Sequence, residues 1–289
     1  MLNKFITLCL LIISMNGAAQ NKGWTSLFNG KDLKDWKVKI NGHPLNDNYA
    51  NTFRVENGAM KVSYDGYSEW KERYGHIFYK KPFSAYVLVV EYRFTGDQIP
   101  GGPGWATRNS GAMLHGQSPE SMGLNQDFPI SLETQFLGGD GKNERTTLNL
   151  CTPGTNVFLN GKLFTPHCVN STSKTYHGDQ WVRAEIVVLG DSLIQHRLEG
   201  KTVFEYSKPQ IGGGNVGNFD PAVKIDGKRA YEYARRGMAV EIKPKVLEIK
   251  EIEVIYFHES NATHSSRQSL RCLRAGFLVQ HEYSSCWQC

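Results

Sequence analysis

The chain has 289 residues, of which 40% are apolar, 21% charged and 11% aromatic, with 29 glycines. This composition excludes intrinsic disorder, collagen and coiled coil, and the length suffices for one large β domain or two smaller ones. The formal net charge is +5, but residues 1–19 and 262–289 together carry four basic residues and one acidic residue. The rest of the chain is close to neutral, which gives no support for nucleic-acid binding.

The first 20 residues have the pattern of a secretory signal. Lys4 provides a positive charge, an apolar run follows, and Gly17-Ala18-Ala19 forms a small-residue cleavage site. The apolar run of roughly 11 residues is too short to span about 30 Å of hydrocarbon. We therefore expect residues 1–19 to be a signal peptide and the mature protein to be exported, periplasmic or secreted, without a membrane span.

Export determines how the cysteines are interpreted. Cys151 and Cys168 lie in one loop-rich region. In an oxidising compartment we expect a disulfide between them, with two free buried thiols as the alternative. The Cys and His residues between 272 and 289 match no common zinc-finger spacing, and we expect residues 259–289 to form a poorly structured tail.

Through most of the chain the hydrophobic pattern repeats every two residues, as in β-strands. Apolar and polar side chains alternate over residues 86–94 and 182–188. Asn160-Gly161 predicts a hairpin, because a type I′ turn needs positive φ at both positions, and Glu199-Gly200 predicts another. Many short strands joined by glycine-rich turns predict an all-β fold, an antiparallel β-sandwich that forms one domain over residues 22–258.

Three stretches resist assignment to strands, roughly 95–110, 138–180 and 207–236. Segments of this length without regular structure are usually functional when they occur inside a compact domain. We expect them to form walls around a concave face of the sandwich.

The common catalytic motifs are absent. The chain has no nucleophile elbow, phosphate-binding loop or zinc-protease motif, and no strand with the paired carboxylates that direct glycoside hydrolysis needs. In the segment 131–136, alternation places Glu133 and Gln135 side by side on the polar face of an expected strand. That face is either simply solvated or part of a site.

Three further residues have chemistry suited to a site. His115 ends the short apolar run that follows Asn109-Ser110-Gly111, where it is either a turn residue or a functional group. Trp70 and Trp105 lie in polar, glycine-rich surroundings. Each indole is placed to stack on a sugar ring or to pack in the core.

Six segments in chain order match the pattern of one family. They are Leu27–Trp36, Phe53–Gly58, Asn109–Gly111, Leu132–Phe136, His177–Trp181 and Leu198–Lys201. On these segments the chain resembles the 3-keto-disaccharide hydrolase family (DUF1080) over residues 24–257. The resemblance implies a concanavalin A-like jelly-roll sandwich. One departure is expected near the family's closing segment, where Glu241 and Lys250 stand in place of a Gln and an Arg.

The resemblance also implies a particular chemistry. A partner oxidoreductase oxidises a glycoside at C3 of the sugar, and the keto group acidifies the C2 proton. Removal of that proton allows β-elimination of the C1–oxygen bond, and water then adds to the resulting glycal. The reaction needs a base, an electrophile at the keto oxygen and an acid for the leaving group, and a divalent metal ion is a possible electrophile. The alternative is a non-catalytic carbohydrate-binding module of the same fold.

The same resemblance nominates site residues. Glu133 is expected to be the catalytic carboxylate, as base or metal ligand, and His115 and Asp140 are candidate acids, bases or metal ligands. Asn109 lies on the family's Asn-Ser-Gly motif and is expected to bind sugar hydroxyls. The other candidates for substrate binding are Arg108, Gln135, Trp105, Lys174 and His177.

Overall fold

The computed structural model describes residues 24–214, 216, 224–225, 228–229 and 278–280. Within these residues it contains β-strands and three single 3₁₀ turns, and none of its helices is long or apolar enough to cross a membrane. The strands are β1 (Trp24–Ser26), β2 (Trp36–Ile40), β3 (Phe53–Glu56), β4 (Ala59–Val62), β5 (Gly75–Tyr79), β6 (Ala85–Tyr92), β7 (Asn109–Leu114), β8 (Leu132–Leu137), β9 (Asn149–Cys151), β10 (Thr155–Leu159), β11 (Lys162–Phe164), β12 (Cys168–Val169), β13 (Val182–Leu189), β14 (Leu193–Leu198), β15 (Lys201–Ile211), β16 (Lys224–Ile225), β17 (Lys228–Arg229) and β18 (Leu278–Gln280). The expected signal peptide and most of the expected tail lie outside the described residues.

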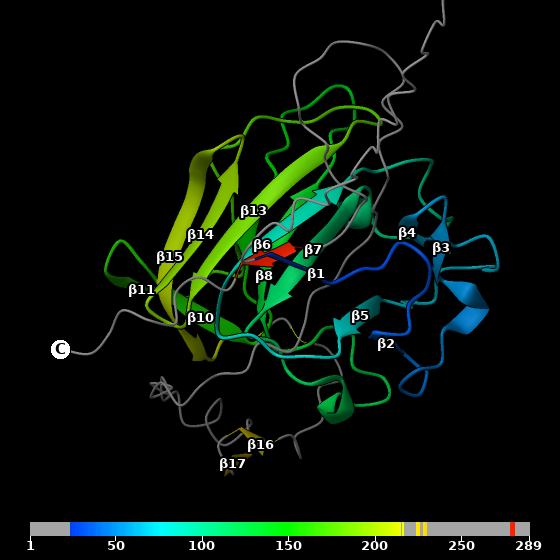
Figure 1. Cartoon of the computed structure of the whole chain (residues 1–289), viewed down its shortest axis with the longest axis horizontal. Coiled ribbons are helices and arrows are strands. Elements are labelled where there is room, and N and C mark those ends of the chain that lie inside the picture. The colour runs from blue at the N-terminus through cyan, green and yellow to red at the C-terminus, as the bar shows by residue number, and fades with distance from the viewer. Residues whose placement is uncertain (1–23, 215, 217–223, 226–227, 230–277, 281–289) are drawn as a thin grey trace, which may run out of the picture.

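Two antiparallel sheets form the body of the domain (Figure 1). The larger has eight strands in the order β1-β18-β6-β13-β14-β15-β10-β11, and the smaller has the order β12-β9-β8-β7. The pairs β2-β5, β3-β4 and β16-β17 form separate two-stranded sheets. The expected all-β fold, an antiparallel jelly-roll sandwich, is confirmed.

Every second side chain along the strands of the two sheets packs into the core between them. In β13, Ala184 and Ile186 are fully buried in the core. In β8, Leu132 and Phe136 point into the same core, and the Phe136 ring stacks on Tyr92 of β6 with 4.4 Å between centroids. Because side chains alternate along a strand, Glu133, Gln135 and Leu137 of β8 point to the opposite face of the small sheet.

A buried histidine links the two sheets through hydrogen bonds. His196 of β14 is fully buried. Its Nδ1 donates to the carbonyl oxygen of Leu148 at 2.9 Å, and its Nε2 lies 2.8 Å from the hydroxyl of Thr134 in β8. Burial lowers the pKa of His196 to about 4, so the ring is neutral at physiological pH.

The burial of His196 predicts a pH dependence of stability. Its folded-state pKa lies below the ordinary value of 6.5, so acidification protonates the unfolded chain first. Protonation of His196 is therefore expected to contribute about 3 kcal/mol to the fall in the free energy of unfolding as the pH drops from 6.5 to 4. Urea unfolding between pH 7.5 and 4.5 measures this loss. The pKa of buried His115 is also lowered to about 4, so this residue contributes a similar loss. His196→Gln should therefore remove about half of the pH dependence of the unfolding free energy. An unchanged pH dependence in this variant would contradict the role given to His196.

Both predicted hairpin turns are confirmed. Asn160 and Gly161 have φ of 51° and 76° between β10 and β11, and Glu199 and Gly200 have 52° and 76° between β14 and β15. The expectation that residues 138–180 lack strands is wrong, because β9 to β12 lie there. These strands have two to five residues each, which is too short to produce a clear alternating pattern.

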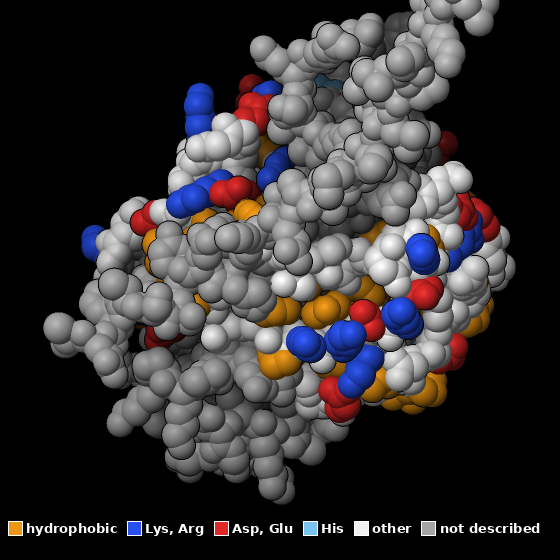
Figure 2. All heavy atoms as spheres, viewed as in Figure 1, with side chains coloured by type: hydrophobic (Ala, Val, Ile, Leu, Met, Phe, Trp, Pro, Cys, Tyr) orange, Lys and Arg blue, Asp and Glu red, His pale blue; other side chains and the backbone are white. Residues whose placement is uncertain are grey.

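The described surface is a mixture of charges. On the face seen in Figure 2, Lys and Arg side chains lie beside Asp and Glu side chains and between apolar ones. Ion pairs such as Lys80–Asp35, at 2.7 Å, reflect the same arrangement. On the described part of this face, opposite charges are therefore interspersed and do not form a single-sign patch.

Candidate functional site

A cavity of about 630 Å³ lies over the outer face of the small sheet. Its base comes from β7, β8, β9 and β12, and its walls come from loop residues that include Tyr64, Trp70 and Trp105. The polar side chains that line it include those of His76, Asn109, Glu133, Gln135, Arg145 and His167. The expected walls are confirmed for residues 95–110 and 138–180, which both contribute to this lining.

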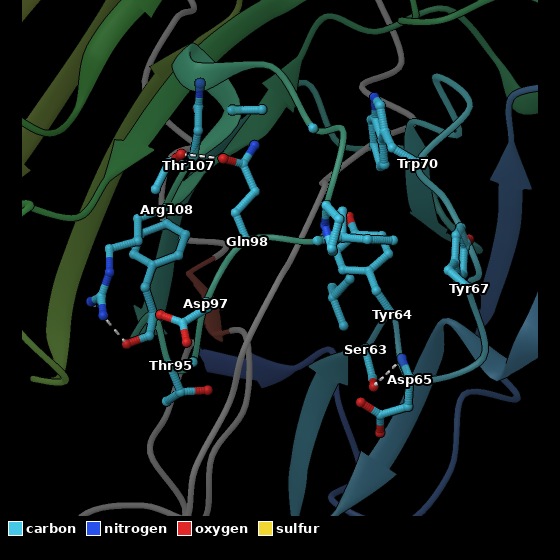
Figure 3. A pocket seen from close by; sticks show the side chains of 18 of the residues that line it. Ser63, Tyr64, Asp65, Tyr67, Trp70, Thr95, Asp97, Gln98, Thr107 and Arg108 are labelled. Atoms are coloured by element: carbon cyan, nitrogen blue, oxygen red, sulfur yellow. Dashed lines mark hydrogen bonds between the residues drawn. The ribbon is translucent and has the colours of Figure 1, made fainter.

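A second cavity of about 550 Å³ adjoins the first, with Tyr64, Trp70 and Asn109 among the residues that line both. In Figure 3 the loop that carries Tyr64 and Trp70 faces the loop that carries Gln98 and Arg108. The hydroxyl of Thr107 donates to Gln98 within the second loop. Because the two cavities share part of their lining, we refer to them together as the elongated cleft.

Glu133 lies at the base of the first cavity. It lies on the cavity-facing side of β8, directly opposite Cys151 of β9 and Met113 of β7. A Cβ atom added to Gly111 would lie 2.5 Å from both Cγ and Oε1 of Glu133. The carboxylate therefore lies over Gly111, and the glycine of the Asn-Ser-Gly motif provides the space that it occupies.

Two amides flank the carboxylate. Gln135 lies directly opposite Gly111, and its Oε1 accepts a hydrogen bond from Asn149 at 3.2 Å. This contact leaves the Nε2 group as the donor that Gln135 offers to the cavity. Asn109 donates from its Nδ2 to the carbonyl oxygen of Trp105 at 3.0 Å. Of the site residues expected from the sequence, Glu133, Gln135, Asn109 and Trp105 line this one cavity.

An aromatic wall stands beside these polar groups. Trp105 is 54% exposed and stacks on Tyr74 with 5.9 Å between centroids and 15° between planes. Tyr74 in turn contacts Phe128 and the edge of Trp70. An exposed indole supported from behind offers a flat apolar face, which suits the apolar face of a sugar ring.

Arg145 holds the loop that carries the aromatic wall. Its guanidinium donates to the carbonyl oxygens of Trp105, Thr107 and Gly138 at 3.1, 2.5 and 2.9 Å. Burial lowers the pKa of Arg145, although the group stays protonated at neutral pH. Sequence reasoning missed Arg145, because a lone arginine in a loop carries no motif.

We expect Arg145→Lys to lower the free energy of unfolding by about 2 kcal/mol, because an ammonium cannot reproduce the planar fork that binds these carbonyl groups. Arg197→Lys is the matched control. Arg197 contacts the partly exposed Glu185 at 3.4 Å, and the same change there should cost less than about 0.5 kcal/mol. Urea unfolding of both variants measures the difference, and equal losses would contradict the role given to Arg145.

The expected disulfide between Cys151 and Cys168 is confirmed and forms part of the cavity wall. It joins β9 to β12 and closes a segment with a sequence separation of 17 residues. We expect the double variant Cys151→Ala/Cys168→Ala to lose about 3 kcal/mol of unfolding free energy under oxidising conditions. Chemical denaturation measures the loss, and a change below about 1 kcal/mol would show that the bridge adds little to stability.

Two histidines that sequence reasoning did not single out, His76 and His167, also line the cavity. His76 donates from Nε2 to the carbonyl oxygen of Asp127 at 2.7 Å. His167 has a buried Nδ1 without a hydrogen-bond partner, and burial lowers the pKa of its imidazole. His167 stands between Pro166 and Cys168, and a single histidine in such a loop gives no spacing signal.

His115 and Asp140 do not line the cavity. His115 is buried beside the turn after β13, where its Nε2 donates to the carbonyl oxygen of Gly190 at 3.1 Å. Asp140 caps an exposed loop by accepting from the backbone of Lys142 and Asn143, each at 2.8 Å, and these bonds lower its pKa. Both side chains have structural contacts here, so the expected catalytic roles find no support in this placement.

Three other candidates also lie away from the first cavity. Lys174 pairs with Glu199 at 2.6 Å, and His177 accepts from the backbone of Gly141 at 3.0 Å through Nδ1. Arg108 lines the adjoining cavity and donates to the carbonyl oxygen of Gly178 at 2.9 Å. Of the three, only Arg108 borders the elongated cleft.

Residues 23–235 match the family described as the 3-keto-alpha-glucoside-1,2-lyase-like domain. The chain belongs to this family. The family acts on carbohydrates, and the cavity built around Glu133 lies within the matched region. The match ends before residue 241, so the expected departures at Glu241 and Lys250 fall beyond it and outside the described residues.

A second, shorter match covers the C-terminal part of the chain. Residues 218–271 match the N-terminal domain of the TruB family of pseudouridylate synthases. The chain is 44% identical over 55 residues to the tRNA pseudouridine synthase B of Rickettsia felis, which covers 18% of this chain and 16% of that protein. It is 59% identical over 34 residues to the enzyme of the same name from Bacteroides fragilis, covering 12% and 15%. The chain thus spans about a sixth of the length of these relatives, and the stretch that includes Glu241 and Lys250 falls within the TruB match.

Proposed function

We propose that the protein cleaves 3-keto-glycosides by removal of the C2 proton, β-elimination of the C1–oxygen bond and hydration of the resulting glycal. The observation that carries the proposal is the position of Glu133, at the base of a cavity and over Gly111, inside the region matched by the family. A keto group at C3 makes the C2 proton acidic enough for a carboxylate to remove. This route needs one base at C2 and no pair of carboxylates across the glycosidic bond.

The neighbours of Glu133 fit the other requirements of this reaction. Negative charge develops on the keto oxygen as the C2 proton leaves, and the Nε2 group of Gln135 is a donor on the same face of the sheet. Asn109 is placed to contact sugar hydroxyls, and Trp105 offers a stacking surface for the ring. His167, which is neutral at physiological pH because burial lowers its pKa, is a second group able to carry a proton.

Two further parts of the proposal concern the setting of the reaction. The N-terminal pattern at residues 1–19 supports export of the mature protein. The substrate must come from an enzyme that oxidises the C3 hydroxyl of a glycoside, so a sugar C3 oxidoreductase is the expected functional partner.

Cleavage of a 3-keto-glucoside is the direct test. The purified protein is incubated with the 3-keto-glucoside and, separately, with the unoxidised glucoside, and aglycone release is followed by chromatography. The proposal predicts release from the keto-sugar alone. Release from both sugars at equal rates would contradict the elimination route. Saturable binding without release from either would favour the carbohydrate-binding module.

A further inference from the structure

Three potential metal ligands meet on the wall of the first cavity. The sulfur atoms of Cys151 and Cys168 and a ring nitrogen of His167 all lie within 4.8 Å of one another. Cys151 and Cys168 are direct cross-strand partners in β9 and β12, and all three residues line the cavity. Among the described His, Cys, Asp and Glu side chains, this is the one group of three whose donor atoms are close enough to share an ion.

His167 is already arranged as a ligand. Its carbonyl oxygen accepts from the backbone nitrogen of Thr152 at 2.8 Å and from the Thr152 hydroxyl at 3.1 Å, which fixes the backbone beside the disulfide. Its Nδ1 is buried without a hydrogen-bond partner, an arrangement that is rare in proteins.

We propose that Cys151, His167 and Cys168 form a redox-gated binding site for a thiophilic divalent cation such as Zn²⁺. The intact disulfide closes the site, because its sulfurs are not thiolates. A dithiol reductant opens it: the dithiol is oxidised to its own disulfide, and the protein bridge is reduced to two thiols. Cation binding then displaces one proton from each thiol. Cys168 is exposed, so a reductant can reach the bridge from solvent.

The expected coordination fits the strands that carry the ligands. Two thiolates on a tetrahedral Zn²⁺ lie roughly 3.8 Å apart, a separation that adjacent cross-strand cysteines reach by rotation about their side-chain bonds. Two sulfurs and one nitrogen leave a fourth position, open to water in the cavity. Loss of the bridge removes about 3 kcal/mol from a domain that typically has 5–15 kcal/mol of stability, so the reduced fold is expected to persist.

Cobalt titration of the whole chain tests the site, because Co²⁺ bound to thiolates gives an intense near-ultraviolet charge-transfer absorption. We expect this absorption in the reduced wild type and not in the oxidised protein. His167→Asn keeps both thiols and should weaken Co²⁺ binding at least tenfold, whereas the control His177→Asn should leave the affinity unchanged. Cys151→Ser/Cys168→Ser should abolish the signal.

The sequence contains four further cysteines, Cys9, Cys272, Cys286 and Cys289, so the double serine variant is decisive. A signal that persists in this variant would belong to those cysteines and would overturn the proposal. Absence of the signal in the reduced wild type, or loss of the β-sheet circular dichroism spectrum on reduction, would also overturn it. The readout is metal binding, so a negative result in the cleavage assay would leave this test intact.

Discussion

Glu133→Gln is expected to lower kcat for cleavage of a 3-keto-glucoside about 1000-fold, while the protein remains folded. The amide has nearly the shape of the carboxylate and fills the same space over Gly111, but it cannot accept the C2 proton. Steady-state kinetics of aglycone release measure kcat and KM separately. A fall in kcat with KM little changed is the expected signature of a lost proton acceptor.

The matched control for this change is Glu205→Gln. Glu205 is exposed on β15, where its carboxylate accepts a hydrogen bond from Gln195 at 2.6 Å. It lines neither of the two cavities that form the cleft. The control should retain wild-type kcat, and if Glu133→Gln also retained it, Glu133 would not be the base.

Gly111→Ala is expected to lower kcat about 100-fold, because the added methyl group displaces the side chain of Glu133. The new Cβ would lie 2.5 Å from the Glu133 carboxylate, so the flexible end of Glu133 must shift. A displacement of about 1 Å at a reacting group typically costs on the order of 100-fold in rate. Gly111 does not have positive φ, so alanine fits the backbone and the free energy of unfolding should change by less than about 1 kcal/mol.

Gly214→Ala separates this effect from a general cost of replacing glycine. An added Cβ at Gly214 meets nothing within 4 Å, and its φ is not positive. Both rate and stability should be unchanged in this variant. If Gly111→Ala kept full activity, or lost stability in proportion to activity, the carboxylate's position over Gly111 would not matter for the reaction.

The sandwich could be predicted because it follows from local rules. Alternation along β13 and β8 identifies the buried face directly, and positive φ at Asn160-Gly161 follows from turn chemistry. The same alternation placed Glu133 and Gln135 together on the face that lines the cavity. In these cases the information lies within a few consecutive residues.

The rest of the site depends on contacts between residues far apart in the chain. Arg145 is recognisable only by the carbonyl groups that it holds 38 and 40 residues earlier, at Thr107 and Trp105. His167 reaches the cavity because β12 pairs with β9. His115 was singled out for its closeness in sequence to the Asn-Ser-Gly motif, yet it lies at the far end of β7, where it bonds to Gly190. Closeness in sequence did not predict closeness in space for this residue.

The most direct test of Glu133 as the C2 base is hydrogen exchange at that carbon. Wild type and Glu133→Gln are incubated with a 3-keto-glucoside in D₂O, and NMR follows the replacement of hydrogen by deuterium at C2. We predict deuterium at C2 of the wild-type product and exchange about 1000-fold slower in the variant. Exchange at the wild-type rate in Glu133→Gln, or a cleaved product that keeps its original C2 hydrogen, would contradict the account.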